Sequence, residues 1–211
     1  MMSEPAMVFV IDDDRSVRKS LARMLDAAHY AVELFESASE FLAHAACPGS
    51  SCVIVDVQMP GLNGIELQKA LIGRGREEQL VFITGHGNIP MCAEAMKAGA
   101  VDFLPKPFKR KELLESIDRA LTRSAEQRHR ASEKNQARAL IEKLTPREFQ
   151  VMELVATGLL NKQVGAELGM AVKTVKTHRA HVMRKLGITS VAELMRVLQQ
   201  AEMTPAVSPR T

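Results

Sequence analysis

The feature that most constrains the fold is the stretch Val53–Gly61, in which an apolar run meets a carboxylate and then a Pro-Gly turn. A short apolar, β-branched run bounded by turn residues predicts a buried parallel strand. Asp56 stands at the tip of this strand, where the chain enters a loop. A buried charge is costly unless it is paired or bound to a cation. We therefore expect Asp56 to serve chemistry rather than packing.

The length and composition bound the class of protein. The 211 residues, 46% of them apolar, suffice for one large or two small globular domains. No apolar run is long enough to span a membrane, and residues 1–6 lack a basic-then-apolar signal pattern, so we expect a cytoplasmic protein. Cys47, Cys52 and Cys92 lack CxxC spacing, which favours free thiols over disulfides or a zinc site.

The net charge of +3 hides an asymmetry between the two halves of the chain. Residues 1–122 hold 13 Lys and Arg against 17 Asp and Glu, whereas residues 123–211 hold 15 against 8. An acidic half joined to a basic half indicates two domains with different partners, and the basic half is expected to bind a polyanion.

Strand and helix patterns alternate through the acidic half. The expected strands are 7–11, 31–35, a run ending at Asp56, 80–84 and 101–104. The expected helices cover 17–28, 37–45, 64–73, 88–98 and a segment from Lys109. This alternation predicts an α/β doubly wound parallel sheet of five strands. Functional residues of such sheets lie at the carboxyl ends of the strands.

Polar side chains follow four of these strands, at the positions Asp12, Asp13, Asp56, Thr84 and Lys106. Three carboxylates brought together repel one another unless a cation lies among them, and an all-oxygen ligand set suits Mg²⁺. Asp56 could then act as a nucleophile toward a phosphoryl group and form an aspartyl phosphate. The metal, Lys106 and the Thr84 hydroxyl would neutralise the charge on the phosphoryl oxygens.

These motifs resemble the receiver domain of two-component response regulators, over residues 7 to 122. The resemblance rests on Asp12-Asp13, the 56–61 loop, Thr84-Gly85 and Lys106-Pro107-Phe108. The stretches 83–87 and 95–100 are similar to the FixJ-type branch in particular. The chain as a whole resembles FixJ-like and aromatic-catabolism (StyR/TodT-like) regulators.

The resemblance implies a flavodoxin-like receiver in which Asp56 is the phosphoacceptor. It implies that Asp13, Asp56 and the Gln58 carbonyl bind Mg²⁺, with Asp12 acting through water. It also places Phe103 as the switch aromatic residue and implies a cis Lys106-Pro107 bond.

Simpler interpretations exist for each residue taken alone. Residues 12–14 could cap a helix, Thr84 could end a strand, Lys106 could be a surface lysine, and Phe103 could be a core residue. A second interpretation of this half is a Mg²⁺-dependent phosphohydrolase that also forms an aspartyl phosphate. Such enzymes commonly place an acid two residues after the nucleophile, where this chain has Gln58, and glutamine cannot act as a general acid.

A polar stretch joins the two halves. Residues 123–138 contain no large apolar residue, no Pro and no Gly. Helix-forming residues dominate this stretch, so we expect it to be a solvated extension of the helix from Lys109. It forms most of a helical linker that covers residues 123–143.

The basic half shows the start and stop signals of four short helices. Thr145–Glu148 is a capping box with Pro146 at the first helical position, and this helix ends at Gly158. We expect Asn161 to cap a second helix that ends at Gly169. A third helix, 172–186, ends at Gly187, and residues 190–193 begin a fourth. The pattern indicates a helix-turn-helix domain, 144–211, that includes a short C-terminal tail.

The third helix has an apolar face and a basic face. Between residues 171 and 187 there are five Lys and Arg and no acid. Val175, Val182 and Leu186 are spaced to pack on the other helices. The outward and flanking positions are Lys173, Thr174, Lys176, Thr177, His178, Arg179, Ala180, His181, Arg184 and Lys185. Although a solvated face is the usual role of such a charge run, the absence of acid favours binding in a DNA major groove.

Residues 144–200 resemble the LuxR-type helix-turn-helix of the NarL/FixJ regulators. The resemblance rests on 144–148, 158–163, 174–179 and 183–186. It implies that Lys176, Thr177 and Ala180 face bases, and that Thr174, Arg179 and Lys185 hold the DNA backbone. It also implies that the last helix forms a dimer contact. Ala171 stands where the family has a capping Ser, and losing such a cap costs about 1 kcal/mol.

Together the two resemblances imply a phosphorylation-switched transcription regulator. Its expected partners are a sensor histidine kinase, double-stranded promoter DNA, RNA polymerase and, when it is phosphorylated, a second copy of the chain. Its only expected chemistry is its own phosphorylation and dephosphorylation. An output domain that binds RNA or protein instead of a promoter is the other alternative.

Overall fold

A computed structural model of the chain describes residues 6–85 and 89–204. The chain divides into two compact units, Met1–Arg128 and His129–Thr211. Within the described residues no helix is long and apolar enough to cross a bilayer.

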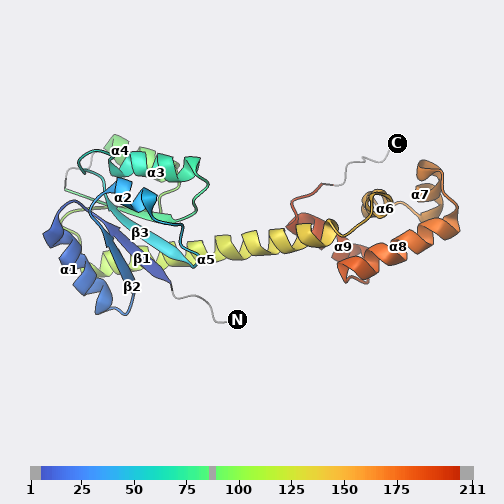
Figure 1. The fold of residues 1–211 in the computed structure, drawn as a ribbon, viewed down its shortest axis with the longest axis horizontal. Coiled ribbons are helices and arrows are strands. Elements are labelled where there is room, and N and C mark those ends of the chain that lie inside the picture. Colours follow the sequence, from blue (N-terminus) through green and yellow to red (C-terminus); the bar gives the residue numbers. More distant parts are fainter. Residues whose placement is uncertain (1–5, 86–88, 205–211) are drawn as a thin grey trace. The chain divides into compact units, whose positions relative to one another are not determined.

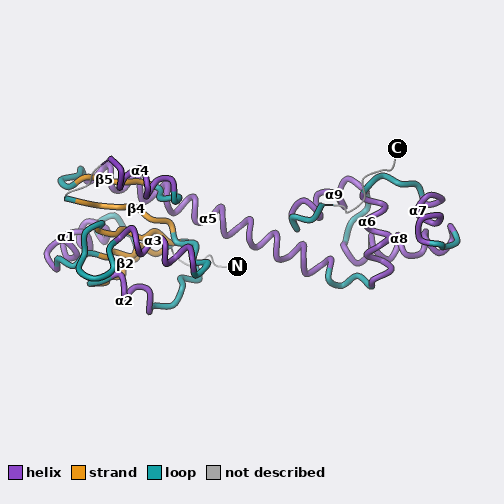
Figure 2. Tube along the Cα trace, turned by 90° about the horizontal axis from the view of Figure 1, so that it is seen from above, coloured by secondary structure: helices purple, strands orange, loops and turns teal. Residues whose placement is uncertain are grey.

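The first unit is built on a parallel sheet of five strands in the order β2-β1-β3-β4-β5. The strands are β1 (Met7–Ile11), β2 (Ala31–Phe35), β3 (Ser51–Asp56), β4 (Gln79–Thr84) and β5 (Asp102–Pro105). Figure 1 shows the strands lying between two layers of helix, and Figure 2 shows the same strands in orange after a turn of 90°. The doubly wound α/β fold predicted from the sequence is confirmed, because the chain goes from β1 outward to β2 and then returns past β1 to β3, β4 and β5, with a helix after each strand.

Two apolar cores, one on each face of the sheet, hold the helices in place. The helices of this unit are α1 (Arg15–Asp26), α2 (Ala38–Ala43), α3 (Gly64–Gly73), α4 (Ile89–Lys97) and the first part of α5 (Arg110–Ile141). Alternate strand residues face opposite sides. Phe9 and Val55 therefore pack with α2, α3 and α4, whereas Val8 and Ile54 pack with α1 and α5. Of the predicted fourth helix, position 88 lies outside the described residues.

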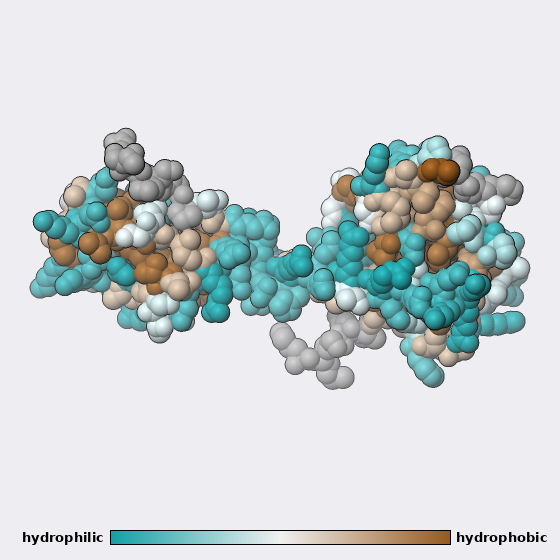
Figure 3. Space-filling view, turned by 180° about the vertical axis from the view of Figure 1, so that it is seen from behind, coloured by the Kyte–Doolittle hydropathy of each residue, from teal (hydrophilic) through white to brown (hydrophobic). Residues whose placement is uncertain are grey.

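The helix α5 continues without a break through the polar stretch that we predicted to be a linker. Figure 3 shows the middle of this helix as a hydrophilic surface. The prediction that the whole segment is solvated is wrong at its two ends, because each end packs against its own unit. The buried Ser124 hydroxyl accepts a hydrogen bond of 3.0 Å from the Ser51 N–H. Arg138 Nε donates to the Ala201 carbonyl at 3.1 Å, and Ala137 is buried.

The second unit is helical, as predicted. After the end of α5 come α6 (Pro146–Ala156), α7 (Asn161–Leu168), α8 (Val172–Leu186) and α9 (Val191–Gln200). One apolar core joins them, and Val175, Val182 and Leu186 of α8 are buried in it as expected. Gly169 and Gly187 end α7 and α8 in the left-handed conformation that glycine adopts without strain.

The start of α7 corrects one prediction. Leu160 occupies the capping position, and Asn161 is the first helical residue. Gln163 Oε1 accepts a 2.8 Å hydrogen bond from the Leu160 N–H. The Asn161 side chain is therefore free to accept a 3.1 Å hydrogen bond from Arg179 on α8. It joins two helices instead of capping one.

A buried carboxylate ties α6 to α8. Glu148 closes the predicted capping box with Thr145, and its Oε2 accepts a 2.6 Å hydrogen bond from Lys185 Nζ. His181 Nδ1 lies 3.5 Å from Glu148 Oε1. The Lys185 hydrogen bond first, and the Thr145 N–H next, lower the pKa of Glu148 to about 2. The acid at the start of α6 is thus a packing contact as well as a cap.

Gly64 packs closely against the end of β3, and this packing can be tested by substitution. A Cβ at Gly64 would lie 2.5 Å from the Asp56 carbonyl oxygen, whereas one at Gly73 would meet nothing within 4 Å. We expect Gly64→Ala to lower the free energy of unfolding by about 1–3 kcal/mol, because backbone atoms must shift. The control Gly73→Ala should be neutral or stabilising by up to about 1 kcal/mol. Urea unfolding followed by circular dichroism measures both, and equal effects would contradict this packing.

Glu148 generates a pH test. Its pKa in the folded chain, about 2, lies below the ordinary 4.5. The folded state therefore binds fewer protons, and the stabilisation is full above about pH 4.5 and disappears as the pH falls toward 2. We expect Glu148→Gln to destabilise the second unit by about 1.5–3 kcal/mol at pH 7 and hardly at all near pH 2. Hydrogen exchange of α6 and α8 amides measures this, with the exposed Glu142→Gln as control; a pH-independent difference would contradict it.

Candidate functional site

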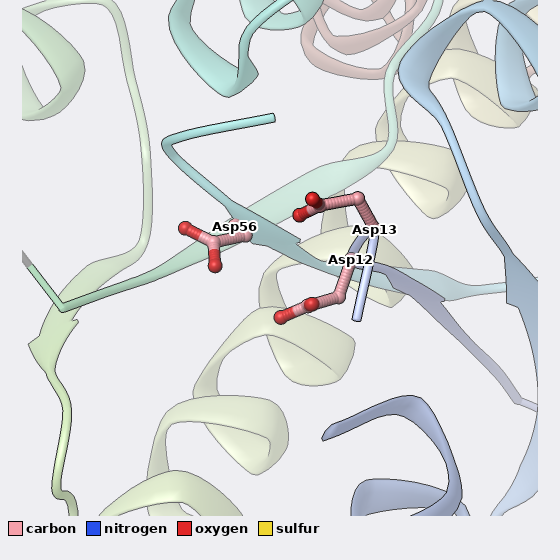
Figure 4. Close-up of side chains that lie close together, drawn as sticks. All are labelled: Asp12, Asp13 and Asp56. Carbon is pink, nitrogen blue, oxygen red and sulfur yellow. The ribbon is translucent and has the colours of Figure 1, made fainter. Parts of the chain in front are cut away.

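Parallel strands bring three carboxylates to one edge of the sheet. Ile11 is paired with Val55, so the residues that follow β1 lie beside the end of β3. Asp12, Asp13 and Asp56 each offer an oxygen, and these oxygens all lie within 4.8 Å of one another. Figure 4 shows the three side chains gathered around one region. Asp12 and Asp56 are buried, whereas Asp13 is exposed.

Lys106 supplies the counter-charge. It follows β5, where its N–H donates to the Thr84 carbonyl at 2.7 Å, and the Lys106-Pro107 bond is cis. Its ammonium lies 2.8 Å from Asp12 Oδ2 and 2.6 Å from Asp56 Oδ2. One ammonium faces three carboxylates, so the pocket keeps an excess of negative charge.

Burial and hydrogen bonding shift the pKa values of Asp12 and Lys106. Burial raises the pKa of Asp12, and the hydrogen bond from Lys106 only partly offsets this effect. Burial by itself would lower the pKa of Lys106, but its hydrogen bonds to Asp12 and Asp56 prevail and raise it. Lys106 is therefore a firmly charged ammonium beside a carboxylate that is costly to ionise.

The remaining predicted residues lie at the end of β4, in the loop after β3 and on β5. Thr84 is fully buried at the end of β4, the strand next to β3. The Gln58 N–H donates a 3.0 Å hydrogen bond to Asp56 Oδ1, so the loop after β3 folds back over the carboxylate. Phe103 is half-buried with its ring centroid 6.0 Å from that of Phe82. Of the motif 83–87, residues 86 and 87 lie outside the described part of the chain.

Sequence reasoning missed Arg18. Its Nη1 donates to the main-chain carbonyls of Asp12, at 2.6 Å, and Asp13, at 2.9 Å. Asp14 caps α1 by accepting from the Ser16 N–H at 2.7 Å, as the simpler interpretation of this acid held. A sequence pattern describes side chains and does not reveal which main-chain carbonyls accept hydrogen bonds. Only the position of Arg18 in the first turn of α1 could have suggested its role.

The donor set fits a hard divalent cation. Its ligands are carboxylate oxygens, one of them exposed, and a few protein oxygens plus water are what Mg²⁺ prefers. A bound cation would relieve the repulsion that Lys106 compensates only in part. A phosphoryl group next to Asp56 would meet the ammonium of Lys106, and a bound cation would supply further positive charge to it.

The outward face of α8 is basic, as the sequence predicted. Six residues of the predicted DNA face are exposed: Lys173, Thr174, Lys176, Thr177, Ala180 and Arg184. The other four, His178, Arg179, His181 and Lys185, are half-buried. Ala171 makes no side-chain cap at the start of α8, which matches the departure noted in the sequence.

Lys185 differs from the other predicted phosphate contacts. Its ammonium is held by Glu148 at 2.6 Å and by the Lys143 carbonyl at 3.1 Å. Its charge is already compensated within the unit. Arg179 donates a hydrogen bond to Asn161, which is neutral. This bond does not compensate the charge of Arg179, so its guanidinium can still bind an anion.

Comparison with known proteins assigns both units. Residues 8–118 match the family described as response regulator receiver domain, and residues 142–198 match the family described as bacterial regulatory proteins, luxR family. The chain is 46% identical to Nodulation protein W of Bradyrhizobium diazoefficiens over 92% of this chain and 86% of that protein. It is 40% identical to the transcriptional regulatory protein FixJ of Azorhizobium caulinodans, over 97% of each chain.

A solved structure of the response regulator StyR is similar over 93% of this chain and 100% of that one, with a TM-score of 0.84 and 45% identity. Its resemblance therefore extends through both units. The receiver family implies a histidine kinase as partner, and the luxR family implies DNA binding. The phosphohydrolase interpretation finds no support among these relatives, which are transcriptional regulators. The chain belongs to the NarL/FixJ family of response regulators, transcription factors that join a receiver domain to a LuxR-type helix-turn-helix.

Proposed function

We propose that Asp56 is the phosphoacceptor and that its phosphorylation by a sensor histidine kinase controls DNA binding by α8. The observation that carries this proposal is the cluster of Asp12, Asp13 and Asp56 oxygens within 4.8 Å, with Lys106 Nζ 2.6 Å from Asp56 Oδ2. Three carboxylates share one ammonium here, since Lys106 pairs with Asp12 and Asp56 while Asp13 adds a further negative charge. Phosphoryl transfer needs positioning and charge neutralisation, and this pocket offers both.

The transfer itself is a displacement at phosphorus. The phosphoryl donor is a phosphorylated histidine of the kinase. A carboxylate oxygen of Asp56 forms a bond to the phosphorus, and the bond between the phosphorus and the histidine nitrogen breaks. The imidazole of that histidine leaves with the electron pair of the broken bond. Lys106 then exchanges its contact with the Asp56 carboxylate for one with a phosphoryl oxygen. The Thr84 hydroxyl would bind another phosphoryl oxygen, and Phe103 would move into the space that Thr84 leaves.

Mg²⁺ is the cation that the pocket is proposed to hold. Asp13, Asp56 and the Gln58 carbonyl would bind it directly, and Asp12 would bind it through water. When bound, it supplies positive charge to the phosphoryl oxygens. Hydrolysis of the aspartyl phosphate would complete the only chemistry of the chain, since Gln58 cannot protonate a leaving group of an external substrate.

On the second unit, we propose that α8 enters the major groove. Lys176, Thr177 and Ala180 would face base edges, with Lys173, Thr174, His178, Arg179 and Arg184 along the backbone. Because Lys185 is paired with Glu148, its main part is to hold α8 on α6. Phosphorylated chains would dimerise through α9 on paired half-sites and contact RNA polymerase. We propose that they do so in the cytoplasm, where promoter DNA is accessible.

Phosphorylation is tested with a small phosphodonor. Acetyl phosphate with Mg²⁺ should add one phosphoryl group to the wild type, detected by intact mass, and none to Asp56→Asn, because the nucleophile is absent. Asp26→Asn removes an exposed acid at the end of α1 and should be labelled like the wild type. Equal labelling of Asp56→Asn and the wild type would refute Asp56 as the acceptor.

The DNA face is tested by selecting binding sites from a random duplex pool. Lys176→Ala should relax the preference at one base position by about 1–3 kcal/mol, because a contact to a base edge is lost. Arg179→Gln should weaken all sequences alike and reduce the slope of log K against log salt by about one. If both variants change the selected sequence, or both leave it unchanged, the proposed division into base and backbone contacts is wrong.

A further inference from the structure

We infer that Arg18 is a positioning residue for the acidic pocket, which fixes the loop that aims Asp12 and Asp13 and thereby sets the affinity for a divalent cation. This inference rests on the proposed cation site at Asp12, Asp13 and Asp56. It concerns a side chain that touches neither the cation nor the phosphoryl group.

A few hydrogen bonds fix the conformation of the loop between β1 and α1. The Asp12 N–H bonds the Phe35 carbonyl of β2 at 3.3 Å, and Asp12 Oδ1 accepts from the Asp14 N–H at 2.9 Å. The two carbonyls that follow β1, those of Asp12 and Asp13, are both bound by Arg18 Nη1. One guanidinium nitrogen thus joins two consecutive peptide groups of the loop to the body of α1.

The position of Asp13 depends most on the hydrogen bonds of Arg18. Within the described part of the chain, its carboxylate makes no hydrogen bond or ion pair, and its side chain is exposed. Nothing but its own backbone therefore directs it toward Asp56. Asp12, in contrast, is buried and held by Lys106 and the Asp14 N–H. Loss of Arg18 would free the peptide that carries the least restrained of the three acids.

Arg18 is itself well restrained. Its side chain is 14% exposed, and its Nη2 lies 3.9 Å from Glu36 Oε2 just after β2. A planar guanidinium of low exposure loses less conformational freedom on bonding than a flexible ammonium does. Partners that orient metal ligands without touching the metal commonly contribute tenfold or more to metal affinity.

Charge and position predict opposite results, which makes the inference testable. Arg18 is a cation beside an acidic pocket, so simple electrostatics predicts that removing it strengthens Mg²⁺ binding. If Arg18 acts by positioning, its removal weakens Mg²⁺ binding in spite of the lost repulsion. The sign of the change separates the two effects.

The experiment is a calorimetric titration of Mg²⁺ into the full chain. We expect Arg18→Met to raise the Kd for Mg²⁺ about tenfold. Lys19→Met, the matched control, removes a neighbouring exposed cation of α1 without touching the loop and should leave the Kd unchanged or lower it slightly. Arg18→Lys keeps the charge but not the planar donor, and should raise the Kd severalfold even if Arg18→Met fails to fold.

A second readout separates positioning from general stability. With acetyl phosphate, Arg18→Met should need more Mg²⁺ for half-maximal labelling but reach a rate within about threefold of the wild type at saturating Mg²⁺, since it leaves Asp56, Lys106 and Thr84 in place. A purely structural residue would lower the melting temperature without Mg²⁺ and leave the Kd unchanged. An unchanged or lower Kd in Arg18→Met and Arg18→Lys overturns the inference, whereas a wild type that does not bind Mg²⁺ overturns the proposed cation site itself.

Discussion

Repulsion among three carboxylates is the constraint on which the first unit depends. The parallel sheet forces Asp12 and Asp56 to the same edge, and the loop after β1 adds Asp13. Lys106 balances part of this charge through short contacts with Asp12 and Asp56. A buried acid with a raised pKa beside a charged lysine stores electrostatic free energy that a divalent cation can release. The contact between Lys106 and Asp56 is also the one that the proposed phosphoryl group on Asp56 would replace.

Much of the site could be predicted from sequence, because topology brings strand ends together. Once five strands and their order along the chain are recognised, residues directly after β1, β3, β4 and β5 must meet at one edge. Arg18 could not be predicted in this way. It acts on the main-chain carbonyls of Asp12 and Asp13, which every residue type possesses, so no pattern of side chains reveals the contact.

In the second unit, too, the sequence predicted some features and could not predict others. Helical spacing correctly separated the buried face of α8, with Val175, from its basic face. It could not show that Lys185 pairs with Glu148, because that contact depends on how α6 packs on α8. A carboxylate buried between two helices requires a counter-charge, and the nearest lysine supplies it. Likewise, composition predicted that α5 is helical but not that Ser124 is buried at one end of its polar stretch.

The central claim is that the three carboxylates form one cation site. Mn²⁺ has the same preference for oxygen ligands as Mg²⁺ and can be located directly by anomalous scattering. Crystals of the full chain grown with Mn²⁺ should show an anomalous peak bounded by the carboxylates of Asp12, Asp13 and Asp56. A map in which the manganese lies elsewhere, with these carboxylates turned apart, would contradict the account.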